Sequence, residues 1–178
     1  SLYKDGKFTD ANKHYTFVAN QPENIFSEQA VSRAAELTLN AGNHTAALDL
    51  CNRLEAMASN KWNILRANTG QMRCYFALED YNNALIAAVK IKKSETASEV
   101  VKREASFVEG KSNYMTGKLD KALEGLKATA TDVNFEQGAE AKYLVAEILF
   151  KQKDGQKSEA EIVDFIDKNT PHQYWLGK

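Results

Sequence analysis

The sequence predicts an all-α protein built from repeated helical hairpins, and three observations carry this prediction. Two prolines among 178 residues are too few for an all-β fold, which needs many turns. Alanine, the strongest helix former, occurs 24 times and is spread evenly along the chain. A short phrase of residues also recurs at a nearly constant interval, which is the signature of a repeat architecture.

The phrase consists of a small or polar residue, a polar residue, an aromatic residue or leucine, two polar residues, and then alanine or serine. It occurs five times, as Gly6–Ala11, Gly42–Ala47, Glu79–Ala84, Gly117–Ala122 and, more loosely, Lys153–Ser158. Its closing residues are separated by 36, 37, 38 and 36 positions. About five units of this length fill the chain, so we expect a single array over residues 1–178.

Each phrase lies between two stretches whose apolar residues recur at helical spacing. Around the second phrase these residues are Val31, Ala34, Ala35 and Thr38 before it, and Leu48, Cys51 and Leu54 after it. We therefore expect each phrase to form a tight turn between two helices, with its glycine at positive φ. The closing alanine is small because two helices that cross closely leave no room for a larger side chain.

Composition excludes several classes of function. The formal net charge is -1, and no basic stripe offers a surface for nucleic acid. No run of 18 apolar residues predicts a transmembrane helix. The three histidines are far apart and have no cysteine or carboxylate at ligand spacing, so we expect neither a metal nor a cofactor.

No catalytic motif is found, and we expect the protein not to be an enzyme. The acidic pairs Glu159/Glu161 and Asp164/Asp167 are expected on a solvated helix face. Cys51 and Cys74 lie among apolar residues, which favours buried free thiols. A disulfide between neighbouring helices is the less favoured alternative, because a domain of this size can be stable without a disulfide.

The phrase and its flanking helices resemble the tetratricopeptide repeat (TPR) family, which has small residues at the helix crossing and glycine in the turn. Alignment on the closing alanine places Ala35, Met72, Gly110 and Ala146 at the small-residue position of the first helix, and Gly42 and Gly117 match the turn glycine. The chain departs from the family at His44, Gly155 and Asn113, and its period exceeds the usual length of about 34 residues. Overall the sequence is similar to a segment of the large TPR proteins of bacteria.

This resemblance implies a right-handed α-solenoid whose first helices line a concave groove. It implies a non-catalytic scaffold that binds a protein or peptide of unknown identity in that groove. The residues expected to bind this partner are Arg66, Arg73, Phe76, Phe107, Lys111, Tyr114, Tyr143 and Phe150. The alternative, that the aromatic residues among them merely pack between adjacent first helices, is equally compatible with the pattern.

The second candidate function is a glycan-binding accessory protein of the bacterial envelope, built on TPR-like helices. The resemblance slightly favours the cell envelope or periplasm over the cytoplasm. Both ends of the sequence look like interrupted units, because the first lacks most of its leading helix and residues 170–178 only begin a sixth. We therefore expect a segment of a longer chain, with self-association through the open ends as a further possibility.

Overall fold

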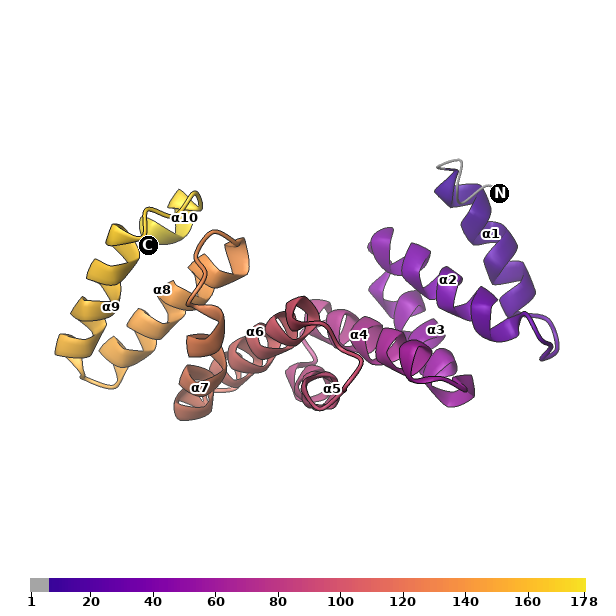
Figure 1. Ribbon diagram of the computed structural model, residues 1–178, viewed down its shortest axis with the longest axis horizontal. Helices are drawn as coiled ribbons and strands as arrows, with labels where there is room; N and C mark the ends of the chain where they lie inside the picture. The colour runs from indigo at the N-terminus through magenta and orange to yellow at the C-terminus, as the bar shows by residue number, and fades with distance from the viewer. Residues whose placement is uncertain (1–6) are drawn as a thin grey trace. The chain divides into compact units, whose positions relative to one another are not determined.

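The computed structural model describes residues 7–178, and in this range it contains ten α-helices and no strand (Figure 1). The all-α prediction is therefore confirmed for these residues, while Gly6 of the first phrase lies outside them. The helices are α1 (Phe8–Ala19), α2 (Ser27–Asn40), α3 (His44–Met57), α4 (Lys61–Ala77), α5 (Tyr81–Lys92), α6 (Glu99–Met115), α7 (Leu119–Thr129), α8 (Glu136–Lys151), α9 (Gly155–Asp167) and α10 (Gln173–Leu176).

The helices form two compact units, one ending at Ala97 and the other beginning at Ser98. In the first unit, each helix from α1 to α5 packs against the next one along the chain. In the second unit the same holds from α6 to α9, and α10 packs back onto α8. This order of contacts is that of a helical repeat, in which α2, α4, α6 and α8 are the first helices of hairpins and α3, α5, α7 and α9 are the second.

The four described phrases make the same turn between the two helices of a hairpin. Their opening residues all have positive φ: 77° at Gly42, 61° at Glu79, 76° at Gly117 and 63° at Lys153. In each turn the amide of the following residue donates to the carbonyl oxygen five residues earlier, at N···O distances of 2.8–3.2 Å. This is the hydrogen bond that ends a helix in a left-handed residue, so the predicted turn is confirmed even where the residue is not glycine.

The second residue of the phrase starts the next helix. Asn43, Asp80 and Asp154 are the N-caps of α3, α5 and α9, and each side chain accepts a hydrogen bond from the amide three residues later. Such a cap satisfies an amide that has no partner inside the helix. The turn is thus encoded locally, by one residue that ends a helix and a polar neighbour that begins the next.

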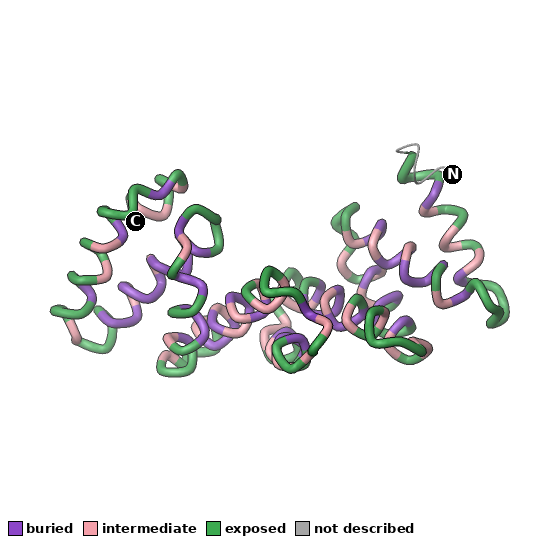
Figure 2. The backbone as a smooth tube through the Cα atoms, viewed as in Figure 1, coloured by how far each residue is buried: buried purple, intermediate pink, exposed green. Residues whose placement is uncertain are grey.

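The closing residue of the phrase is buried in every hairpin, as expected from its small size. Ala11, Ala47, Ala84, Ala122 and Ser158 are between 0% and 4% exposed. Ser158 shows where this residue lies, because its hydroxyl donates to the carbonyl oxygen of Ala146 on the paired helix at 2.9 Å. Buried residues recur along the facing sides of the helices within each unit (Figure 2).

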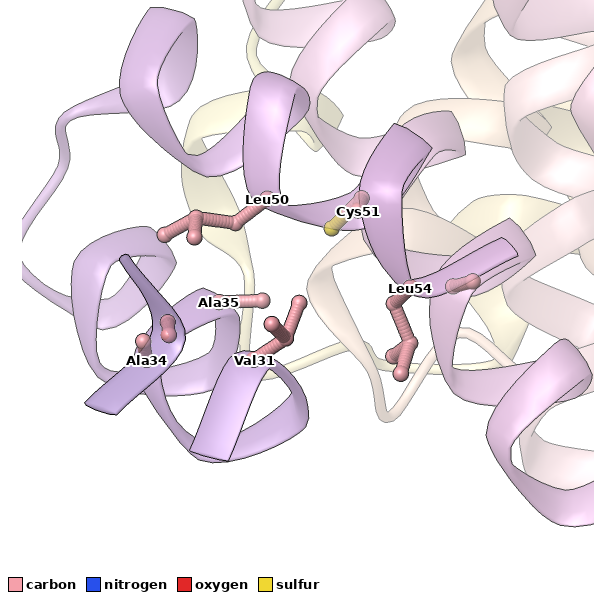
Figure 3. Close-up of a cluster of buried hydrophobic side chains, with 8 residues drawn as sticks. Val31, Ala34, Ala35, Leu50, Cys51 and Leu54 are labelled. Atoms are coloured by element: carbon pink, nitrogen blue, oxygen red, sulfur yellow. The ribbon is translucent and has the colours of Figure 1, made fainter. Parts of the chain in front are cut away.

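Helices α6 and α7 approach each other closely at a point where both carry glycine. A Cβ atom added to Gly125 of α7 would lie 2.8 Å from the Cα atom of Gly110 on α6, which is closer than real Cβ contacts allow. In the first unit, α2 and α3 pack instead through small and aliphatic side chains. There the side chains of α2 pack against those of α3 in one buried cluster, which contains Val31, Ala34 and Ala35 of α2 and Leu50, Cys51 and Leu54 of α3 (Figure 3).

The strained turn residues provide a test of this geometry. Lys153 is exposed but holds a φ that costs a residue with a Cβ atom about 1 kcal/mol. We expect Lys153→Gly to raise the free energy of unfolding by about 0.5–1 kcal/mol, measured by urea denaturation. Lys153→Ala is the matched control, since it also removes the charge but keeps the Cβ atom; equal stabilisation by both substitutions would contradict the strained turn.

Candidate functional site

Three of the predicted partner-binding residues lie in the first unit, all on α4. Arg66 and Arg73 are exposed, whereas Phe76 is half-buried. Arg66 donates from Nη1 to the Ser32 hydroxyl of the preceding first helix at 3.4 Å. Phe76 packs edge-on against Tyr81 of its own hairpin, with ring centroids 6.0 Å apart, so part of this ring serves to join α4 to α5.

The other five predicted residues lie in the second unit, where several contact one another or a shared partner. Tyr114 of α6 donates from its hydroxyl to Glu147 of α8 at 2.9 Å, and Lys151 donates to the same hydroxyl at 2.7 Å. Lys151 also forms an ion pair with Glu147 at 2.8 Å, and its ammonium lies 4.8 Å from the centroid of the Tyr114 ring. We call Tyr114, Glu147 and Lys151 the α6–α8 network.

The charges of this network are matched internally. The hydrogen bonds to Glu147 and Tyr114 raise the pKa of the Lys151 ammonium above its ordinary value, so Lys151 is cationic at neutral pH. Nearer the N-termini of α6 and α8, Lys111 of α6 forms an ion pair with Glu140 of α8 at 2.5 Å. The adjacent first helices α6 and α8 are therefore joined by one ion pair, Lys111–Glu140, and by the hydrogen bonds of the Tyr114 hydroxyl to Glu147 and Lys151.

The aromatic residues of the predicted site in the second unit differ in how far they are exposed to solvent. Phe107 is buried, with the Lys111 ammonium 5.6 Å from the centre of its ring. Tyr143 is half-buried, and its ring lies against Trp175 of α10 with centroids 5.9 Å apart. Burial also raises the pKa of the Tyr143 hydroxyl. Phe150, by contrast, is 72% exposed.

Phe150 borders a cavity of about 270 Å³ among α8, α9 and α10, which we call the α8–α10 cavity. Its lining is mainly apolar and includes Tyr143, Ala146, Phe150, Ile162, Phe165, Ile166, Trp175 and Leu176. Ile162 and Ile166 are 48% and 55% exposed. The residues at the position of Ile162 in three earlier hairpins, Cys51, Ala88 and Leu126, are at most 2% exposed. The last described hairpin therefore exposes an apolar side chain, Ile162, at a position that these three hairpins bury.

A second charged cluster corrects the expectation of a solvated acidic face on α9. Glu161 and Asp164 both form ion pairs with Lys142 of α8, the Asp164 contact at 2.5 Å, and the Lys142 side chain is only 6% exposed. Burial alone would lower the pKa of Lys142, but its hydrogen bonds to Asp164 and Glu161 raise it. Glu159 and Asp167 are exposed, as expected.

Sequence reasoning missed Lys142 and Trp175. Lys142 stands between Ala141 and Tyr143 in an ordinary helical pattern. Its two partners follow it by about 20 residues and belong to the next helix, so no spacing within one helix reveals the pairing. Trp175 belongs to the interrupted sixth unit, and the repeat pattern did not predict which helix this unit would pack against. The ion pair of Glu147 with Lys151 could have been predicted from the sequence, because opposite charges four residues apart on a helix interact.

Residues 7–178 contain no group of three or more His, Cys, Asp or Glu side chains that could hold a metal ion. None of the helices described in this range is both long and apolar enough to cross a membrane. Comparisons of the chain with protein-family models, with curated proteins and with solved structures each found no match. The interpretation of the site therefore depends on its own geometry.

The Lys142 cluster predicts a pH-dependent contribution to stability. The hydrogen bonds from Lys142 and Lys168 lower the pKa of Asp164 below its ordinary value of 3.8. Because the folded pKa is lowered, the stabilisation is present above pH 3.8 and is lost as the pH falls through the folded value. We expect Asp164→Asn to lower the free energy of unfolding at pH 7 by about 0.5–1 kcal/mol, a partly exposed pair being worth no more.

The measurement is urea denaturation of both proteins from pH 7 down to pH 3, where the difference between them should shrink. Asp167→Asn is the matched control, because Asp167 is exposed on the same helix, and it should change stability less at pH 7. A difference between wild type and Asp164→Asn that stays constant over this range would contradict the ion pair.

Proposed function

We propose that this chain is a non-catalytic interaction scaffold, a TPR-like right-handed α-solenoid that binds a protein or peptide partner on its first helices. The recurrence of one turn geometry and one buried closing residue supports a repeat of this kind. Such repeats place equivalent residues of successive first helices side by side, which provides an extended surface for a partner. The exposed Arg66 and Arg73 of α4 belong to this proposed surface in the first unit.

The observation that carries the proposal is the α8–α10 cavity, where the first helix α8 meets α9 and α10 and the border is exposed and apolar. A cavity of about 270 Å³ is somewhat smaller than the sites that enclose drug-sized ligands, which start at roughly 300 Å³. It is large enough for one bulky apolar side chain of a partner. Exposed apolar residues gathered around such a pocket are typical of the anchoring point of a protein interface.

The α6–α8 network beside the cavity supports a partner held mainly by apolar contact. Glu147 and Lys151 neutralise each other, and Tyr114 hydrogen-bonds to both. The partner therefore needs no charge opposite Glu147 or Lys151. Its own polar groups can still bond to the exposed half of the Lys151 side chain, which is 45% exposed. We infer a peptide segment with a large aliphatic or aromatic residue as the partner.

The proposal is tested by selecting peptides from a random display library on the 178-residue chain and measuring their affinity for variants. Phe150→Ala should weaken binding by about 1–3 kcal/mol, which is the range of an interface anchor. Because Phe150 is 72% exposed, the thermal unfolding midpoint should hardly change. The selected peptides should share a bulky apolar residue, and their affinity should depend only weakly on salt.

Phe135→Ala is the matched control, since Phe135 is 58% exposed in the same unit but precedes the opposite end of α8. It should leave the affinity unchanged. Peptides that bind equally well to the wild type and to Phe150→Ala would contradict the role of the cavity. Failure to select any peptide, although the chain is folded by circular dichroism, would contradict the scaffold function itself.

A further inference from the structure

The two cysteines of the chain lie together across the interface between α3 and α4. Both are free thiols in the structure, with Cys51 2% exposed and Cys74 fully buried. Cys51 belongs to the packed cluster of the first unit, where it lies between Leu50 and Leu54 on α3 (Figure 3). Its thiol hydrogen-bonds to that of Cys74 on α4. The two residues therefore join the second hairpin to the third.

Gly70 brings the two helices close enough for this contact. A Cβ atom added at Gly70 of α4 would overlap the Cys51 sulfur, so the absence of a side chain makes room for that sulfur. Cys74 lies four residues after Gly70, which places it one turn along on the same face of the helix. The Cys51 sulfur thus occupies a gap beside the backbone of α4, with Cys74 as its neighbour along the helix.

We propose that Cys51 and Cys74 are a redox-sensitive pair that closes to an intramolecular disulfide when a small-molecule disulfide is present as oxidant. This inference is independent of the proposed partner-binding function. The geometry that favours closure is the position of the Cys51 sulfur against the backbone of Gly70, one helical turn from Cys74 on the same face of α4. The oxidant reaches the sulfurs during brief local separation of α3 and α4, a motion of lower free energy than global unfolding.

The reaction proceeds by two exchanges. The Cys74 thiolate attacks one sulfur of the oxidant, which forms a mixed disulfide and releases one thiol. Cys51 then loses its proton to solvent and attacks the Cys74 sulfur, which forms the Cys51–Cys74 bond and releases the second thiol. Two electrons pass to the oxidant, and the two protons lost by the cysteines are balanced by those gained on the released thiols. The hydrogen bond from Cys51 lowers the pKa of the Cys74 thiol, which makes Cys74 the first nucleophile.

The test equilibrates the reduced 178-residue chain in glutathione buffers of increasing oxidised fraction, then quenches with acid, alkylates the remaining thiols and maps the peptides by mass spectrometry. The Cys51–Cys74 disulfide should form in the folded chain with an equilibrium constant at least about tenfold larger than in the urea-unfolded chain. Because stabilisation of the disulfide by the fold equals stabilisation of the fold by the disulfide, the oxidised protein should unfold about 3 °C or more above the reduced protein. Dithiothreitol should reverse this shift.

Cys51→Ala and Cys74→Ala are the matched controls, and each should show no oxidant-dependent rise of the unfolding midpoint. The comparison of folded with unfolded wild type needs neither variant, so it remains decisive if one of them folds poorly. Three results would overturn the proposal: free thiols in the folded chain under conditions that oxidise the unfolded chain, mixed disulfides with glutathione in place of the intramolecular bond, or equal closure in both states.

Discussion

Paired helices can cross closely in this protein only because small residues occupy the crossing, and the remaining features depend on that contact. Where Gly110 faces Gly125, the two backbones approach with no side chain between them. Where Ser158 meets Ala146, the hydroxyl reaches the carbonyl oxygen of the opposite helix. A close crossing gains dispersion contacts along both helices, whereas one larger side chain would force them apart. Small residues at these contacts thus set the distance between the paired helices.

This contact also explains which positions are free to carry function. The crossing uses one face of each first helix, and the residues on the neighbouring face are held by contacts between successive first helices. In the second unit those contacts are polar, as in the α6–α8 network and the Lys111–Glu140 pair. At the last described hairpin Phe150 and Ile162 are exposed instead, and this is where we propose that an apolar partner binds.

The sequence predicts the hairpin geometry well because the signals are local. A residue that ends one helix, a polar cap and a small closing residue lie within six positions, so the turns at Glu79 and Lys153 follow from the phrase even without glycine. Whether an aromatic side chain is exposed to solvent, in contrast, is not determined by its neighbours in the sequence. Phe107 and Phe150 look alike in the sequence, but one is buried and the other exposed, because packing by distant residues decides the outcome. For the same reason, the sequence does not predict that Lys142 is buried and paired with Glu161 and Asp164.

The most direct test of the close crossing is the sign of the stability change in Gly125→Ala compared with Gly155→Ala, both measured by urea denaturation. Alanine in place of a helical glycine normally stabilises by about 0.5–1 kcal/mol, and at Gly155 nothing lies within 4 Å of the added methyl group. Gly155→Ala should therefore be neutral or stabilising. Gly125→Ala should instead lower the free energy of unfolding by about 1–3 kcal/mol, because its methyl group meets the backbone of Gly110. If Gly125→Ala stabilised the protein as much as Gly155→Ala, the close crossing of α6 and α7 would be contradicted.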